Sequence, residues 1–279
     1  MLNALRHLRP LITAVALLLP AAAALAQAQP ATKPFEPFSG QPGKDVVWVP
    51  TSQAMVDRML DIAKVTANDY VIDLGSGDGR TVITAAKRGA RAAGIEYNPE
   101  MVDLSKSNAA KEGVTEKATF MKADLFESDF SRATVITMFL LPDINVKLRP
   151  KILDLKPGTR IVSNTFTMGE WKDDETATVA ENSGCSYYCT AHLWIVPAKA
   201  AGNWQLAQGE LTLKQEFQMV QGTLKSGGNA VAVTNGRLRG DMISFSAGGA
   251  SYTGRVNGNG MEGTVVTGGT TTRWAATRR

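Results

Sequence analysis

The sequence predicts an α/β fold in which a parallel sheet is covered by helices on both faces, followed by a small antiparallel β unit. Three observations lead to this fold class. Residues 46–198 alternate short apolar runs with helical patterns, which is typical of repeated strand–helix units. Glycine then becomes dense, with 14 in residues 203–279 against 12 in the preceding 202. Alternating stretches between those glycines indicate antiparallel strands.

The first 26 residues are typical of a secretory signal peptide. Basic residues precede an apolar run at 11–25, and Ala24-Leu25-Ala26 forms a small-residue cleavage signal before Gln27. We therefore expect cleavage and export, to the periplasm, with no stable membrane insertion afterwards. The alternative is an uncleaved membrane anchor, but a spanning helix needs about 20 apolar residues. This run is shorter, and Pro20 interrupts it.

The composition of the chain after the predicted signal peptide argues against several classes of function. Residues 27–45 are rich in Pro and Gly, which predicts an extended linker. Loss of Arg6 and Arg9 with the leader leaves 28 basic residues against 26 acidic ones, so the charge balance gives no support for a nucleic-acid partner. Of the two histidines, His7 is lost in the same way. We expect no metal site, and the shortage of histidine argues against most hydrolase triads.

The only cysteines, Cys185 and Cys189, are candidates for one disulfide in an oxidising compartment. Two independent thiols are the alternative. In an extended strand a separation of four residues places the two Cα atoms too far apart to bridge.

The elements of residues 46–198 follow from periodicity and from their end signals. Thr51 can cap a first helix that runs to Ala63. Asn98, Pro99 and Gly113 are the cap, first residue and stop of another helix. We expect strands at 70–74, 92–96, 118–122, 134–140, 159–165 and 188–196, and further helices at 80–88 and 144–155, the latter bent or broken at Pro150.

The C-terminal residues 203–279 predict a meander or partial barrel. Four expected strands span 211–217, 230–234, 242–246 and 251–256. The expected turns are Gly227-Gly228, Asn235-Gly236, Gly248-Gly249 and Asn257-Gly258. We expect this unit to be structural or to present a substrate, because nothing in it supplies chemistry.

Open parallel sheets bind ligands at the carboxyl ends of their strands. Here the first predicted strand runs into the turn Asp73-Leu74-Gly75-Ser76-Gly77-Asp78-Gly79. Its glycines let the backbone approach a ligand, and the N–H groups of the next helix point into the same space. A dinucleotide-binding turn would need a small residue where Arg80 stands, and no Gly-Lys-Ser/Thr of a Walker loop follows.

The turn resembles the first motif of class I S-adenosylmethionine-dependent methyltransferases. Two more carboxylates stand where that family places them, Glu96 at the end of the second strand and Asp124 after the third. The resemblance implies S-adenosylmethionine as cofactor, with Glu96 accepting from the ribose hydroxyls and Asp124 from the adenine amine. Asp73 would order the turn and the methionine amine. The other contacts expected from the turn are Gly75, Ser76 and Gly77.

Further segments resemble the seven-strand protein-lysine methyltransferases that include the ATP synthase c-subunit lysine methyltransferase. They are Val49-Pro50-Thr51, Thr137–Pro142, Leu155–Arg160 and Ser163–Phe166, within a resemblance over residues 46–198. It implies a Rossmann-like sheet in the order 3-2-1-4-5-7-6 with strand seven antiparallel, and cofactor contacts from Val49, Pro50 and Thr51. Asn164 stands where those relatives tend to have a histidine.

The segment after the fourth strand narrows the acceptor. Phe139, Leu140 and Pro142 offer no polar group to hold the exocyclic amine of a base, and neither cysteine is near for cytosine chemistry. An apolar lip of this kind suits a lysine stem or a desolvated amine. Asp143 can steer a cation, or equally cap the next helix. Phe139 and Leu140 can equally be plain strand core.

These observations predict an exported S-adenosylmethionine-dependent methyltransferase whose acceptor is a protein lysine or another, small-molecule amine. Because this cofactor is made in the cytosol, a non-catalytic exported binding protein that keeps the fold is an alternative. A small-molecule O-methyltransferase would need a base or a metal cluster near the fourth strand, and the sequence offers neither. The oligomeric state stays open.

Overall fold

The computed structural model describes residues 35–180 and 183–279. The predicted signal peptide, 1–26, and residues 27–34 of the predicted linker lie outside the described residues. Within the described part of the chain, no helix is both long and apolar enough to cross a membrane.

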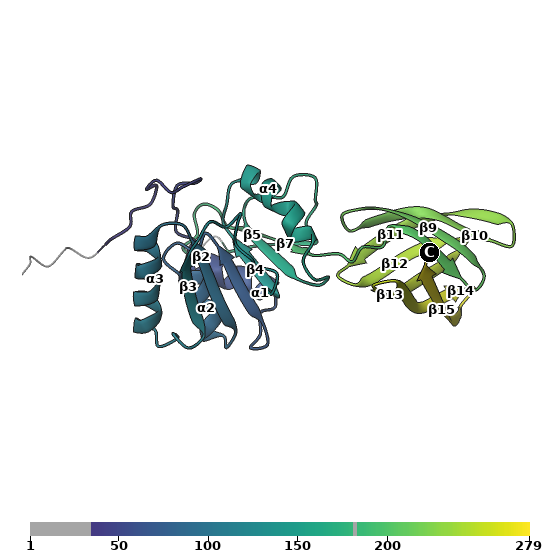
Figure 1. Ribbon diagram of the computed structural model, residues 1–279, viewed down its shortest axis with the longest axis horizontal. Helices are drawn as coiled ribbons and strands as arrows, with labels where there is room; N and C mark the ends of the chain where they lie inside the picture. Colours follow the sequence, from purple (N-terminus) through teal and green to yellow (C-terminus); the bar gives the residue numbers. More distant parts are fainter. Residues whose placement is uncertain (1–34, 181–182) are drawn as a thin grey trace, which may run out of the picture. The chain divides into compact units, whose positions relative to one another are not determined.

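Residues 70–195 contain a seven-stranded sheet, part of which is labelled in Figure 1. The strand order is β3-β2-β1-β4-β5-β7-β6. Strands β1 to β5 pair in parallel, and β7 runs antiparallel to both β5 and β6. The predicted fold class and strand order are confirmed. The strands are β1 Tyr70–Leu74, β2 Arg91–Glu96, β3 Ala118–Lys122, β4 Val135–Met138, β5 Arg160–Asn164, β6 Glu175–Thr178 and β7 Thr190–Ile195.

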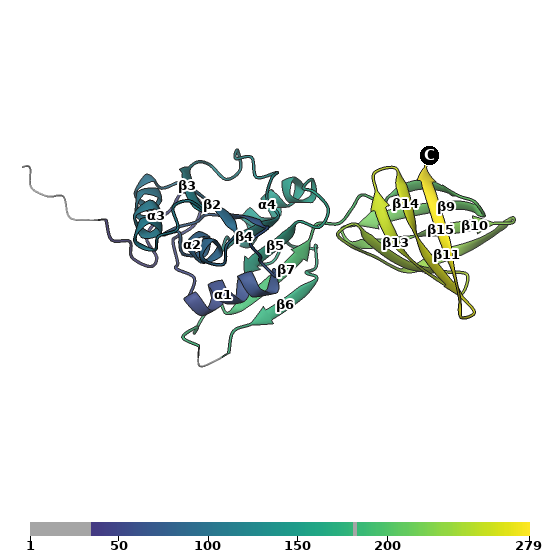
Figure 2. The ribbon, with the colours of Figure 1, turned by 90° about the horizontal axis from the view of Figure 1, so that it is seen from below.

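Helices cover both faces of the sheet because successive strand residues point to opposite sides. Val71 faces a core cluster shared with α1 (Gln53–Ile62), α2 (Arg80–Lys87) and α3 (Pro99–Lys111). Its neighbour Ile72 belongs to a second cluster, which contains residues of α4 (Pro142–Leu153). Figure 2 shows α1 and α2 side by side on their face.

Two helix starts differ from the sequence prediction. Ser52, not Thr51, caps α1, because its extended backbone lets Oγ accept a hydrogen bond from the Met55 N–H at 3.3 Å. The helix α4 starts at Pro142, in the favoured first position, and β4 ends at Met138, two residues earlier than expected.

The same helix α4 continues through Pro150 to Leu153, so of the expected bend or break at Pro150 the break is wrong. Pro150 removes one backbone donor, and it lies on the exposed side of the helix, where water can serve the freed carbonyl.

Eight strands of the C-terminal region close into a barrel, in which each strand pairs with the next and β8 pairs with β15. Closure goes beyond the expected meander or partial barrel. The strands are β8 Gly202–Leu206, β9 Gly209–Glu216, β10 Met219–Ser226, β11 Asn229–Arg239, β12 Met242–Ala247, β13 Ala250–Asn257, β14 Gly260–Thr267 and β15 Thr270–Arg278.

One of the predicted turns is wrong. Asn235-Gly236 lies inside β11, at a bulge where the pairing with β10 and β12 shifts register. Asn235 takes a left-handed φ of 51°, and a Cβ on Gly236 would collide with the carbonyl oxygen of Val220. The Asn-Gly pair therefore lets β11 approach β10 closely at the bulge.

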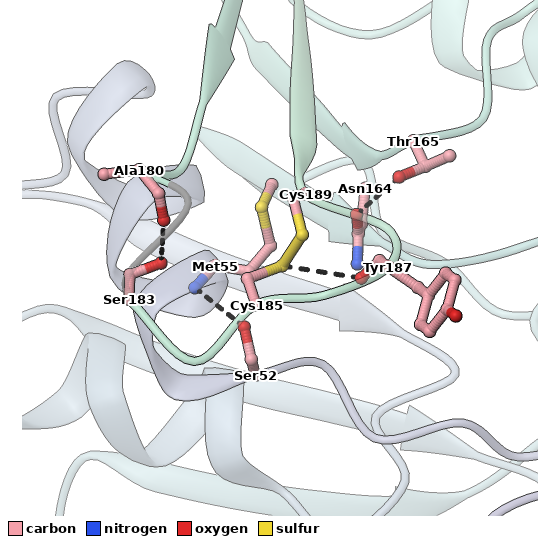
Figure 3. The surroundings of a disulfide bond; sticks show 9 residues. All are labelled: Ser52, Met55, Asn164, Thr165, Ala180, Ser183, Cys185, Tyr187 and Cys189. Atoms are coloured by element: carbon pink, nitrogen blue, oxygen red, sulfur yellow. Dashed lines mark hydrogen bonds between the residues drawn. A yellow bond between two sulfur atoms is a disulfide. The ribbon is translucent and has the colours of Figure 1, made fainter.

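Cys185 and Cys189 form a disulfide, with their Cα atoms 5.9 Å apart (Figure 3). The bridge is possible because β7 begins only at Thr190, two residues later than expected. The preceding residues form a curved loop, in which Tyr188 has a positive φ of 60°. An extended strand would hold the two cysteines too far apart, and this segment is not extended.

Candidate functional site

A cleft lies at the carboxyl ends of β1, β2, β3 and β4. We call it the edge cleft; the loops after these strands and the N-terminal arm, residues 41–51, line it. It encloses about 1060 Å³ of space between atoms, its open mouth included. All nine residues predicted to contact a cofactor line this cleft: Val49, Pro50, Thr51, Asp73, Gly75, Ser76, Gly77, Glu96 and Asp124.

The glycine turn between β1 and α2 forms the floor of the edge cleft. Gly75 and Gly77 have positive φ values of 76° and 54°, which favour glycine. The backbone N–H groups of Gly75 and Ser76 both donate to the carbonyl oxygen of Ile95, at 2.9 and 3.1 Å. A Cβ on Gly77 would collide with the indole of Trp48, so glycine there also lets the arm pack on the turn.

Glu96 joins the end of β2 to this turn. One carboxylate oxygen accepts from the Gly77 N–H and the other from the Asn98 N–H, each at 2.9 Å. These two bonds fix the side chain in the cleft wall. Each oxygen keeps a second lone pair, so the carboxylate can still accept hydrogen bonds from a vicinal diol.

Asp73 is buried beneath the turn, with 6% of its surface exposed. The pKa of Asp73 is raised to about 7, mainly by burial; a hydrogen bond from the Thr137 hydroxyl at 2.6 Å lowers it, and the nearby Glu96 contributes to the rise. The carboxyl group therefore changes charge near neutral pH. A cation bound beside it would favour the ionised form.

Asp124 is paired with the arm. Its Oδ1 accepts from the Phe126 N–H at 2.9 Å, and its Oδ2 accepts from Lys44 Nζ. The hydrogen bond from Lys44 is the main reason that the pKa of Asp124 lies below its ordinary value. Lys44 Nζ also lies 5.0 Å from the centre of the Tyr97 ring. Asp124, which we expect to accept from an adenine amine, is thus already paired with the cationic Lys44.

Lys44, Trp48 and Tyr97 also line the cleft, and they were not predicted from the sequence. Lys44 falls in the segment that composition predicts to be a linker, and its contact with Asp124 joins residues 80 positions apart. One signal was present: a tryptophan beside Val49-Pro50-Thr51 in a polar, glycine-containing stretch. An isolated aromatic residue of that kind often packs on a neighbouring surface.

The predicted acceptor lip divides between two places. Phe139, half-buried, and Leu140, 3% exposed, line the edge cleft. Pro142 and Asp143 are outside its lining and form the first turn of α4, where the acidic Asp143 favours the helix start. Phe139 continues the apolar surface away from the cleft, with its ring centre 5.9 Å from that of Phe166.

Two further side chains of the sheet domain, a histidine and a tryptophan, have structural roles. His192 Nδ1 lies 3.0 Å from Asp173 Oδ2, within β7 of the sheet. Trp171 is fully buried against Trp194 and Phe217.

The charge of the cleft fits a cationic ligand rich in hydrogen-bond donors. Five acidic residues line it, opposed by Lys44 and Arg80; they are Asp45, Asp73, Asp78, Glu96 and Asp124. Ser76 also lines the cleft, but its Oγ is buried against Gly94 of β2 and has no hydrogen-bond partner. An ammonium, a ribose diol and an exocyclic amine are the donor groups of S-adenosylmethionine, so the residues present fit this cofactor.

Known proteins similar to this chain agree with S-adenosylmethionine as the cofactor. The family profile described as ANTKMT methyltransferase domain matches residues 73–175. A protein-lysine N-methyltransferase of Saccharolobus islandicus is 47% identical over 141 residues, which cover 50% of this chain and 88% of that protein. The ATP synthase c-subunit lysine N-methyltransferase of Xenopus laevis is 34% identical over 128 residues, or 46% of this chain and 56% of that one.

A solved structure is similar over the same region. It is described as an RNA methyltransferase from Salinibacter ruber in complex with S-adenosyl-L-homocysteine. The match has a TM-score of 0.51 and 44% identity, and covers 54% of this chain and 95% of that one. The similarity leaves roughly half of this chain without a counterpart in that protein.

Proposed function

This chain belongs to the class I S-adenosylmethionine-dependent methyltransferase family that includes protein-lysine N-methyltransferases, and we propose that its acceptor is an amine, the Nζ of a protein lysine. One observation carries this proposal. The surface next to the cofactor residues is apolar, made of Phe139 and Leu140, where a base-modifying enzyme would present polar groups. The names of the similar proteins agree with a lysine acceptor.

An apolar lip matters because methyl transfer needs a neutral amine. The reference pKa of lysine is near 10.4, so a neutral amine at pH 7 costs about 4 to 5 kcal/mol. Contact with Phe139 removes water from the amine and so lowers its pKa. The proton then leaves to solvent, and the lip holds the nitrogen in line with the transferring group, which supplies most of the catalysis in such a reaction. When bound, S-adenosylmethionine supplies the electrophilic methyl group.

We assign the cofactor contacts to the edge cleft. Glu96 accepts from the ribose hydroxyls, and Asp124 accepts from the adenine amine in competition with Lys44. Asp73 holds the methionine ammonium, and its ionised form is then favoured. The remaining contacts come from the backbone of Gly75, Ser76 and Gly77 and from the segment Val49-Pro50-Thr51.

Asp143 lies on the exposed first turn of α4, and we propose that it draws a cationic acceptor toward the lip. Asp143→Asn should then raise KM for the acceptor more than it lowers kcat, because steering acts before the chemical step.

We propose that the protein is exported and that its mature chain starts at Gln27. The leader pattern of residues 1–26 supports export. The Cys185–Cys189 disulfide supports an oxidising compartment such as the periplasm. N-terminal sequencing of the exported protein tests this assignment, and an intact Met1 on membrane-bound protein would contradict it.

The acceptor assignment is tested with cofactor that carries a tritiated methyl group. The purified protein is incubated with an extract of the exported proteome, and the labelled products are hydrolysed and separated. Label is expected in methylated lysine, with turnover rising with pH as the bound amine deprotonates. Label in RNA, which the description of the Salinibacter relative makes the natural alternative, would contradict the amine assignment. So would label in hydroxyl or carboxyl groups alone.

A further inference from the structure

Three aromatic rings meet beside the lip of the edge cleft, and we call them the three-ring cluster. Phe139 follows β4, Phe166 follows β5, and Tyr188 lies in the loop before β7. The ring centres of Phe139 and Tyr188 are 5.1 Å apart, and those of Phe166 and Tyr188 are 6.0 Å apart. Phe139 and Phe166 are half-buried, and Tyr188 is 43% exposed. The cluster therefore offers an aromatic surface to solvent, continuous with the lip through Phe139.

Strained backbone flanks this cluster. Thr165 and Tyr188 are not glycines, yet they have positive φ values of 64° and 60°. Such residues cost stability and persist only where their surroundings hold them, often at functional sites. The Thr165 N–H donates to the Thr190 carbonyl at 2.7 Å, which ties the end of β5 to the start of β7. The cluster is thus held in place although Thr165 and Tyr188 have unfavourable backbone conformations.

The disulfide holds the loop that carries Tyr188. Cys185 and Cys189 bracket this residue in a closed loop of five (Figure 3). Cys185 is 9% exposed and belongs to the core cluster that contains Met55 of α1. The Cys189 carbonyl accepts from the Val179 N–H at 3.0 Å. Both ends of the loop are therefore anchored in the protein, while Tyr188 between them faces solvent.

A buried amide without a partner lies at the same edge. Asn164, the last residue of β5, is 1% exposed, and its Nδ2 has no hydrogen-bond partner, whereas its Oδ1 accepts from the Thr165 hydroxyl at 3.0 Å. An unsatisfied buried donor is costly, and an acceptor group of a bound chain would relieve that cost. This group stands beside the segment that leads to Phe166.

We propose that the three-ring cluster binds the aliphatic stem of the acceptor amine, and that Tyr188 is a specificity-determining residue held in place by the Cys185–Cys189 disulfide. The proposal rests on the amine-methyltransferase function proposed above. The ring centres are too close together to admit a side chain between them, so the stem lies across their exposed faces. Those faces attract an alkylammonium by cation–π interaction before the amine loses its proton.

The consequence is an acceptor site that depends on the redox state of the protein. Reduction turns the disulfide into two thiols, which frees the loop and lets Tyr188 leave its strained conformation. Acceptor affinity then falls, whereas cofactor affinity is unchanged, because Glu96, Asp73 and the glycine turn have no part in the loop.

The test uses the mature full chain saturated with S-adenosylhomocysteine, and n-butylammonium as the probe of a lysine side chain. Nuclear magnetic resonance of ¹³C-labelled aromatic rings follows a titration with the probe. We expect saturable shifts at Phe139, Phe166 and Tyr188, and about five- to tenfold weaker binding in Tyr188→Ala. The matched control is Tyr187→Ala, since Tyr187 is 83% exposed, lies in the same loop and should bind the probe as the wild type does.

The second part of the test is reduction of the Cys185–Cys189 disulfide. A phosphine reductant opens the disulfide and is itself oxidised, and it should weaken probe binding in the wild type to the level of Tyr188→Ala, with no further loss in that variant. Equal binding by Tyr188→Ala and wild type would overturn the role of Tyr188. Unchanged probe binding by the reduced wild type would overturn the role of the disulfide. This result needs only the wild-type protein, so it decides the question even if Tyr188→Ala does not fold. Failure to bind S-adenosylhomocysteine would instead refute the proposed function.

Discussion

At the carboxyl edge of the sheet, Asp73 and Ser76 are buried in a cleft, and Ser76 Oγ has no hydrogen-bond partner. Inside the barrel, Phe245 and Tyr252 stack with ring centres 4.6 Å apart, and the Trp274 indole N–H donates to the carbonyls of two strands. Among the described residues, the buried side-chain polar atoms without a partner all lie between residues 76 and 171. Of these residues Ser76 lines the edge cleft, whereas the described barrel residues have no such unpartnered atom.

This difference distinguishes a ligand-binding region from a region with a filled core. A site that binds a small molecule keeps polar groups and space that only the ligand completes. A filled aromatic core contributes stability and leaves no such groups. We therefore expect substitutions in the barrel to alter the free energy of unfolding, and substitutions at the sheet edge to alter ligand affinity.

The largest effect should come from Trp274→Ala. Trp274 is 5% exposed and packs edge-on against Phe245 and Tyr252. Loss of a buried aromatic side chain costs about 3–5 kcal/mol in the free energy of unfolding. Urea denaturation measures this loss, and calorimetry on the folded variant should find cofactor affinity unchanged. A large drop in that affinity would show that barrel and cleft are one functional unit.

Glu96→Ala should weaken cofactor binding rather than the stability of the fold. A hydrogen bond to a charged group contributes about 1.5–3 kcal/mol, so cofactor binding should weaken by about tenfold to a hundredfold. Isothermal titration calorimetry provides the affinities. Glu262→Ala is the matched control, because Glu262 is an exposed carboxylate on the barrel. Equal affinity for the wild type and Glu96→Ala would remove Glu96 from the site.

The pH dependence of stability and of binding should differ in sign because of Asp73. Its pKa is about 7 in the folded protein against 3.8 for the ordinary group, so the fold favours the protonated form. The free energy of unfolding should therefore fall as pH rises from about 4 to about 7. Cofactor affinity should rise over the upper part of that range, because the methionine ammonium prefers the ionised carboxylate.

Asp73→Asn tests both trends. This variant should lose the part of each pH dependence that Asp73 causes, as measured by urea denaturation and by calorimetry at pH values from mildly acidic to mildly alkaline. A cofactor affinity in the wild type that falls with rising pH would contradict the placement of the ammonium at Asp73.

A smaller effect is expected from Lys44→Ala. Lys44 competes with an adenine amine for Asp124 Oδ2, so removing Lys44 should raise cofactor affinity by about two- to fivefold, the range of an exposed ion pair. Lys225→Ala on the barrel is the control, since Lys225 is also exposed. A weaker affinity in Lys44→Ala would mean that the arm lysine helps to bind the cofactor.

Much of the sheet could be predicted from the sequence because its signals are local. The strands β1 and β3 have the expected residues, since each is a short run between clear breaks. Asn98 and Pro99 mark the start of α3 as expected. The shift of the α1 cap from Thr51 to Ser52 was not predictable, because two adjacent hydroxyl residues carry the same signal.

The parts that were missed depend on contacts distant in the sequence. The bulge at Asn235-Gly236 depends on Val220 in another strand, while the local signal of Asn-Gly is a turn. The pairing of Lys44 with Asp124, and the meeting of Phe166 with Tyr188, each join residues of separate elements. Periodicity and composition contain no information about such pairs.

Hydrogen–deuterium exchange of the full chain, with and without S-adenosylhomocysteine, tests the division between sheet edge and barrel most directly. Ligand contacts slow exchange by suppressing local opening. We predict slower exchange in the arm at 41–51, in the turn at 73–79 and around Glu96 and Asp124, with no change in residues 202–278. Protection confined to the barrel, or none at the turn with ligand bound, would contradict this division.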